Sequence, residues 1–91
     1  MKKEEPGNQT KEKKHKDSYF LILFNDEINT FDHVIKSLSE VCGHDPCQAE
    51  QCAMIAHFKG SCEVKTGPEA SLNAMSQELG KRELKSKVEK A

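Results

Sequence analysis

Hydrophobic and polar positions follow one another along the chain in a pattern that predicts three strands and three helices. Residues 19–24 (YFLILF) are continuously apolar, and a run of this length suits a buried strand. Apolar residues then recur at helical spacing as far as Cys42, whereas small residues dominate the next helical stretch. The predicted elements are a strand at 19–24, helices at 29–42 and 45–60, a strand at 61–65, a helix at 67–80 and a strand at 84–88.

Capping residues mark the ends of the first two helices. Asn29 and Asp32 have the spacing of a capping box at the start of the first helix, and Gly43 is placed to end it. Asp45 followed by Pro46 is a stronger start signal, because the Asp side chain can accept hydrogen bonds from free backbone amides and Pro suits the first turn.

The order of elements predicts the fold class and the domain organisation. Strand, helix, helix, strand, helix, strand is typical of an α+β domain, here a three-stranded sheet with helices packed on one face, and we assign it to residues 19–91. Residues 1–18 contain six Lys and four acidic residues with almost no apolar side chain. Such a segment cannot bury enough surface to offset the entropy of ordering, so we expect a disordered N-terminal arm.

Composition excludes several classes of function. The 91-residue chain is 35% hydrophobic and 32% charged, and its formal net charge of −1 argues against broad binding of nucleic acid. The longest apolar run is far too short to span a membrane, and no cleavage site follows it. Without a secretion signal we expect a cytoplasmic protein whose four cysteines are reduced.

Three groups of residues are candidates for chemistry. The turn Asn25-Asp26-Glu27 follows the most apolar strand, a position suited either to binding or to simple turn and cap chemistry. His57 near the end of the second helix suits either a binding role or a favourable contact with the helix dipole. No nucleophile motif and no glycine-rich phosphate loop is present, so we expect no enzyme and no cofactor. The cluster Cys42, His44, Cys47 and Cys52 suggests zinc, but buried thiols are the favoured interpretation.

Taken together, these residues resemble the ClpS family, small adaptors that deliver proteins with certain N-terminal residues to the Clp ATPase–protease. The resemblance begins with the apolar strand that runs into Asn25-Asp26-Glu27 and continues through the capped helix start Asn29-Thr30-Phe31. It also includes residues 51–60 (QCAMIAHFKG), where a small-residue helix ends in a His, an aromatic residue and a Gly. The similarity extends over about residues 19–91.

The resemblance implies a site, partners and a use for the arm. Asn25, Asp26 and His57 would bind the free α-amino group of an N-degron substrate protein. The first side chain would enter a hydrophobic pocket lined by Phe31, Val34, Ala53, Ala56 and Leu84. The implied partner is a Clp-type AAA+ ATPase that engages residues 1–18, and we expect a monomeric adaptor without metal or cofactor.

Two alternatives to the adaptor stay open from the sequence. A ribosomal-stalk-like domain has a similar strand–helix–helix plan but does not need Asn25, Asp26 and His57 together. A zinc-binding interaction module would use the four clustered Cys and His residues.

Overall fold

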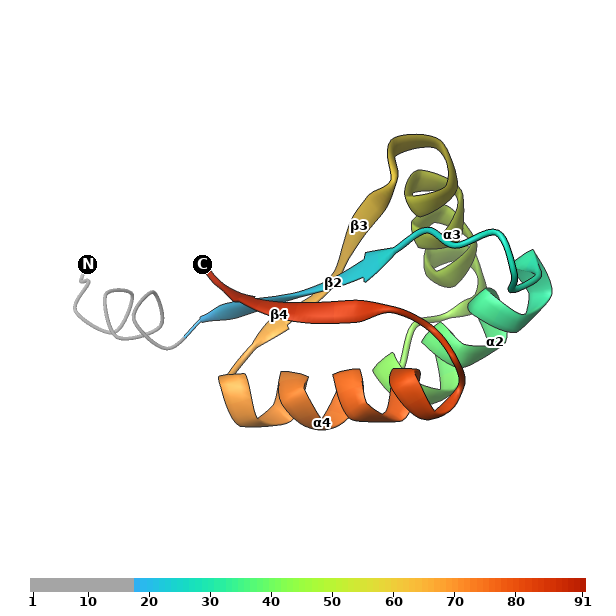
Figure 1. Cartoon of the computed structure of the whole chain (residues 1–91). Coiled ribbons are helices and arrows are strands. Elements are labelled where there is room, and N and C mark those ends of the chain that lie inside the picture. The colour runs from blue at the N-terminus through green and yellow to red at the C-terminus, as the bar shows by residue number, and fades with distance from the viewer. Residues whose placement is uncertain (1–17) are drawn as a thin grey trace, which may run out of the picture.

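The computed structural model describes residues 18–91, and these form the predicted α+β domain in the order β-α-α-β-α-β (Figure 1). The predicted arm at residues 1–18 lies, except for Ser18, outside the described residues. The elements are β2 (Tyr19–Phe24), α2 (Phe31–Cys42), α3 (Pro46–Lys59), β3 (Ser61–Gly67), α4 (Glu69–Lys81) and β4 (Ser86–Lys90).

The sheet is antiparallel and has the strand order β3-β2-β4. The most apolar strand, β2, is therefore the central one, which explains why its sequence is a continuous apolar run. Leu21 and Leu23 on one of its faces are fully buried, whereas Phe20, Ile22 and Phe24 on the other face are half-buried. One face of the sheet thus carries the core.

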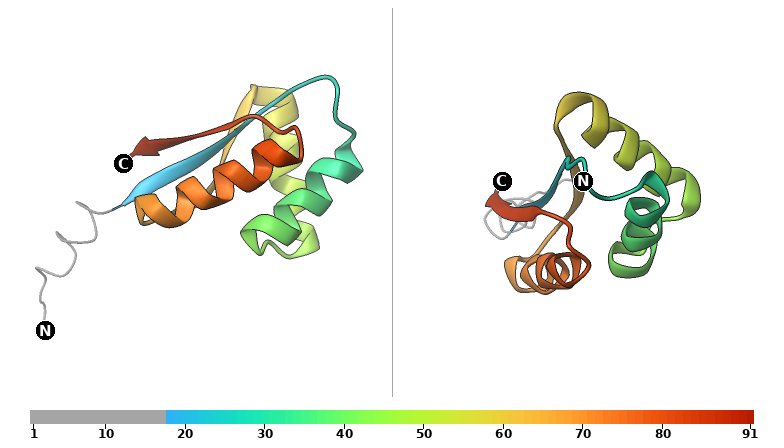
Figure 2. Two further views of the ribbon diagram at one scale, coloured as in Figure 1. Left: turned by 60° about the horizontal axis from the view of Figure 1, so that its bottom comes forward. Right: turned by 45° about the vertical axis from the view of Figure 1, so that its right-hand side comes forward.

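The helices meet the sheet on the face that bears Leu21 and Leu23. Leu38 of α2 and Leu72 and Leu79 of α4 are almost completely buried, and they belong to one hydrophobic core cluster with Leu21 and Leu23. α2 contacts both α3 and α4 and lies between them (Figure 2). Within the described part of the chain, none of the helices has the length and apolarity that a membrane crossing requires.

The predicted capping box at the start of the first helix is wrong by one residue. Thr30 is the N-cap of α2, because its side chain accepts a hydrogen bond from the backbone N–H of His33 at 3.1 Å. Asn29 precedes the cap and uses its side-chain amide to contact Asp26 instead. The start of α3 is as predicted, with the Asp45 carboxylate accepting from the backbone N–H of Gln48 at 2.8 Å.

Two boundaries near the end of the chain also differ from the sequence prediction. β3 continues to Gly67 because β2 pairs with it along its whole length, with Tyr19 opposite Gly67. β4 begins only at Ser86, and Leu84 lies in the turn before it, where it is 3% exposed. The alternation that suggested a strand from Leu84 onward thus includes a turn residue whose side chain enters the core.

Candidate functional site

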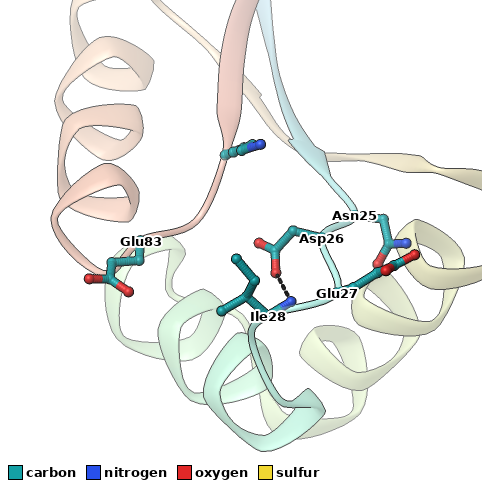
Figure 3. Close-up of a pocket in the computed structure, with 6 residues that line it drawn as sticks. Asn25, Asp26, Glu27, Ile28 and Glu83 are labelled. Atoms are coloured by element: carbon teal, nitrogen blue, oxygen red, sulfur yellow. Dashed lines mark hydrogen bonds between the residues drawn. The ribbon is translucent and has the colours of Figure 1, made fainter.

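The loop between β2 and α2 is shaped by the carboxylate of Asp26. Oδ1 accepts hydrogen bonds from the backbone N–H groups of Ile28 and Asn29, each at 2.9 Å, and the bond to Ile28 is drawn in Figure 3. Oδ2 accepts a bond of 2.9 Å from the side-chain amide of Asn29. An Asp that satisfies the next backbone amides in this way forms a local turn, so the loop conformation follows largely from the sequence.

The same contacts determine the charge state of Asp26. Partial burial would raise the pKa of its carboxyl group. The hydrogen bonds from the backbone and side chain of Asn29 and the backbone of Ile28, together with the positive charge of Lys85, outweigh that effect. The net result is a pKa below the ordinary value for Asp. The loop therefore presents an ionised carboxylate at neutral pH.

Asn29 joins this loop to the turn between α4 and β4, a role that its sequence position did not indicate. Its side-chain amide donates to the backbone carbonyl of Glu83 at 2.8 Å as well as to Asp26. Nearby, the His33 ring donates through Nε2 to the carbonyl of Arg82 at 2.8 Å. The Phe24 backbone N–H donates to the carbonyl of Lys85 at 2.9 Å. Both ends of the loop are thus fastened to the same turn.

A cavity of about 40 Å³ lies between this loop, α2 and α3. All eight residues expected at the site from the resemblance line it: Asn25, Asp26 and His57, with Phe31, Val34, Ala53, Ala56 and Leu84. Three residues that the sequence interpretation did not include also line it: Leu23, Phe24 and Asn29. Polar acceptors and apolar walls are therefore combined in one small space.

α3 reaches the cavity because two of its residues are alanines. Ala53 and Ala56 are each 3% exposed and form the helix side of the wall. Their lack of bulk allows the helix to approach while leaving space between the elements. His57 follows Ala56 directly in the last turn of α3, and the backbone N–H of Asn25 donates to the carbonyl of Gly60 at 3.0 Å. This bond holds the loop against the end of the helix that carries His57.

Two aromatic rings, those of Phe31 and Phe58, contact the His57 ring edge-on. The ring of Phe31 meets the imidazole edge-on, with centroids 5.6 Å apart and an interplanar angle of 89°. Phe58 meets it in a similar way at 5.0 Å. Neither imidazole nitrogen has a hydrogen-bond partner within residues 18–91. Phe31 itself is 41% exposed, so the edge of the cavity can adjust.

This arrangement suits a ligand that combines a cationic donor with an apolar group. The Asn25 amide oxygen, the Asp26 carboxylate and a neutral His57 can each accept a hydrogen bond. Such acceptors favour a positively charged donor, and the walls of Ala, Val, Leu and Phe favour an apolar side chain attached to it. The geometry offers no nucleophile beside a base among these residues.

The residues of the zinc-binding alternative do not form a ligand set. Cys42 is buried, which raises the pKa of its thiol, and Cys47 is exposed. The His44 ring donates through Nε2 to the carbonyl of Val64 at 2.6 Å. Across residues 18–91, no three His, Cys, Asp or Glu side chains are grouped so that they could hold a metal ion.

Comparison with known proteins identifies the family. A family model described as ATP-dependent Clp protease adaptor protein ClpS matches residues 14–88. A comparison with curated proteins found no match. The fold resembles a solved structure of Agrobacterium tumefaciens ClpS2 bound to L-phenylalaninamide, with a TM-score of 0.77 and 23% sequence identity over 84% of this chain and 99% of that chain. On the family match, this chain belongs to the ClpS family of Clp protease adaptors.

Proposed function

We propose that the chain binds the free N-terminus and bulky apolar first residue of substrate proteins and delivers them to a Clp-type AAA+ ATPase–protease. The observation that carries the proposal is that Asn25, Asp26 and His57 line the same cavity as the apolar side chains. The Clp adaptor family supplies the context. The ligand in the A. tumefaciens ClpS2 structure, L-phenylalaninamide, has a free α-amino group and a phenyl side chain, the two groups proposed to bind here. The role requires no catalysis by this chain.

The amine is bound by three acceptors, of which Asp26 is held in place by the loop. A protonated N-terminus has three donors, and Asn25, Asp26 and His57 offer one acceptor each. A carboxylate has about four acceptor positions. The loop uses three of those of Asp26, which leaves one for the ligand. Hydrogen bonds to a charged group contribute about 1.5–3 kcal/mol each, so these three contacts would supply most of the specificity for a free N-terminus.

The first side chain enters the apolar part of the cavity. Burial of a Phe or Leu side chain contributes about 1.5–3 kcal/mol. A cavity that binds benzene has a volume of about 150 Å³. Because the present space is about 40 Å³, entry of an aromatic side chain requires the cavity to enlarge, and Phe31 is the most exposed of its apolar lining residues. The partial exposure of Phe31 at the rim leaves room for it to move.

The first prediction concerns which first residues are accepted. Peptides that begin with Phe or Leu should bind with dissociation constants near micromolar, since the gains from the amine and the side chain are offset by the cost of association. Peptides that begin with Asp, Lys or Gly should bind at least about tenfold more weakly, because they bury no large apolar group. Fluorescence polarisation with labelled peptides of otherwise identical sequence measures this. Equal affinities across the series would contradict the proposal.

A matched pair of variants locates the pocket. Ala53→Met places a larger side chain in the wall, and overfilling an apolar site costs about 1–3 kcal/mol, so Phe peptides should lose about tenfold in affinity. Ala74→Met makes the same change at an exposed position of α4 and should leave affinity unchanged. If the two variants bind Phe peptides equally well, Ala53 does not line the functional pocket.

The third prediction concerns delivery and the N-terminal arm. Removal of residues 1–16 should leave peptide affinity intact, because the proposed binding residues all belong to the folded domain, between Leu23 and Leu84. It should lower the rate at which a Clp ATPase–protease degrades a Phe-initiated reporter, because the arm is the proposed handle for the ATPase. An arm of the same length and composition but scrambled sequence tests whether length and composition suffice without the native order of residues. A truncated protein that delivers at the full rate would remove the arm from the mechanism.

A further inference from the structure

Three of the four cysteines gather inside the domain, and the proposed function uses none of them. Cys42 and Cys62 belong to the hydrophobic core cluster, and Cys52 packs against it. Cys47 is exposed to solvent. All four are free thiols. The interior of the domain therefore holds a group of reactive side chains close to one another.

Within this group, Cys52 and Cys62 are the pair in direct contact. Their side chains are in hydrogen-bonding contact, whereas the interaction between Cys42 and Cys52 is electrostatic. Cys52 lies on α3 and Cys62 on β3, and a single residue, Gly60, separates these two elements along the chain. At positions i, i+3, i+4 and i+7, Cys52 shares one side of α3 with three buried alanines, Ala49, Ala53 and Ala56. The pair therefore joins the packed side of α3 to the sheet.

The two thiols differ in their exposure. Cys52 is half-buried, whereas Cys62 is 8% exposed. Burial, together with the contact to Cys52, raises the pKa of the Cys62 thiol to about 12. Cys62 therefore keeps its proton at neutral pH, and an oxidant from solution reaches Cys52 first. An accessible thiol beside a sheltered second one is the arrangement that oxidation converts to a disulfide.

We propose that Cys52 and Cys62 form a reversible disulfide on oxidation by a hydroperoxide, and that this link weakens the binding of a bulky first side chain. The Cys52 thiolate attacks the O–O bond, an S–O bond forms, and the leaving oxygen takes up a proton. The Cys62 sulfur then attacks the sulfenic sulfur of Cys52. The S–S bond forms, the S–O bond breaks, and the hydroxyl group leaves as water with the Cys62 proton. The peroxide gains the two electrons that the sulfurs lose, and an added thiol reverses the reaction.

The link would lie at two walls of the cavity. Ala53 follows Cys52 directly, Leu23 is opposite Cys62 in the register of β2 and β3, and both Ala53 and Leu23 line the cavity. The space of about 40 Å³ must enlarge to accept an aromatic side chain. A covalent bond between α3 and β3 restricts the separation of these walls. This effect on affinity rests on the proposed function, whereas formation of the disulfide does not.

Peptide mapping tests whether the disulfide forms. The full chain is treated with hydrogen peroxide, its remaining thiols are blocked, and it is cleaved after Lys and Glu. Cleavage distributes the cysteines over three peptides: 51–59 with Cys52, 60–63 with Cys62, and 41–50 with Cys42 and Cys47. Mass spectrometry without reduction should find 51–59 joined to 60–63, and dithiothreitol should separate them. Cys52→Ala should abolish this link, whereas Cys47→Ala removes an exposed thiol and should keep it.

Peptide binding tests the effect on the cavity. Oxidised wild type should bind a Phe-initiated peptide at least about fivefold more weakly than reduced wild type, the lower end of the cost of overfilling an apolar site. A Leu-initiated peptide should lose less, because its side chain is smaller. Dithiothreitol should restore affinity, which separates the disulfide from methionine oxidation, since the sulfoxide needs a dedicated reductase. After peroxide treatment, Cys52→Ala should retain its affinity and Cys47→Ala should lose affinity as wild type does.

The outcomes separate the parts of the inference. Absence of the link between 51–59 and 60–63, or a link from 51–59 to 41–50 in its place, would show that the proposed pair is wrong. A correct link that leaves the affinity for Phe peptides unchanged would remove its effect on the cavity. Failure of reduced wild type to bind Phe peptides through their free amine would remove the proposed function and the effect on affinity, and the peptide masses alone would then decide the disulfide.

Discussion

Acetylation of its α-amino group should weaken the binding of a Phe-initiated peptide by at least about 100-fold. The acetyl group removes the positive charge and two of the three donors, so Asn25, Asp26 and His57 lose most of their proposed partners. Two lost contacts of about 1.5 kcal/mol each already amount to 3 kcal/mol, about two orders of magnitude in the dissociation constant. Competition of acetylated and free peptides against one labelled peptide measures the difference.

The control for this experiment is a change elsewhere in the same peptide. Amidation of the C-terminus also removes a charge but leaves the proposed amine contacts untouched, so affinity should stay nearly constant. Equal binding of acetylated and free peptides would show that the cavity recognises only the apolar side chain. The proposed amine-binding role of the three polar residues would then be wrong.

Asp26→Asn should lower affinity for free Phe peptides by about 10- to 100-fold, the value of one hydrogen bond to a charged group. The variant keeps one side-chain oxygen to accept from the backbone of Ile28 and Asn29, so most of the loop should persist. The matched control is Asp32→Asn, which removes an exposed carboxylate from the first turn of α2 outside the cavity. Comparable losses in the two variants would assign the effect to net charge instead of to the site.

Stability in acid provides a second readout for Asp26. Its pKa is lower in the folded chain than its ordinary value, so the ionised carboxylate stabilises the fold. This contribution is fully present above the unfolded-state value of about 3.9 and is lost as the pH falls through the folded-state pKa. The free energy of unfolding of wild type should therefore fall more steeply below about pH 4 than that of Asp26→Asn. Urea unfolding of both proteins between about pH 2 and pH 5 measures this difference. If the free energies of unfolding of the two proteins changed in parallel with pH, the assigned pKa shift would be wrong.

The elements of this fold were predictable because their signals are local. The apolar run in β2 and the Asp45 cap of α3 depend on neighbours a few positions away, and such short-range preferences survive in the folded chain. The loop at Asp26 belongs to the same class, since its carboxylate bonds to residues two and three positions later. The start of α2 differs from the prediction by one residue: the Asn29 side chain bonds to Asp26 nearby and to the distant turn at Glu83, and Thr30 caps the helix instead.

For the site, the chain alone indicated the residue types, and the resemblance placed them together. Nothing local relates Asn25 to His57. They meet because β2 and β3 are antiparallel neighbours. Gly60, between the end of α3 and the start of β3, accepts a hydrogen bond through its carbonyl from the backbone N–H of Asn25. The sequence motif therefore carries the acceptors, whereas strand pairing determines that they share a cavity.

Features that join distant segments required the tertiary structure. Asn29 bonds to the carbonyl of Glu83 across 54 positions, and Leu84 reaches the cavity from a turn that sequence alternation assigned to a strand. Glu83 and Lys85 lie beside the loop at Asp26 only because β4 pairs with β2. Sequence periodicity reports which face of an element is apolar, but it contains no information about which elements become neighbours. Which elements become neighbours depends on the packing of the whole core, because the apolar faces of all the helices and strands must be buried against one another together.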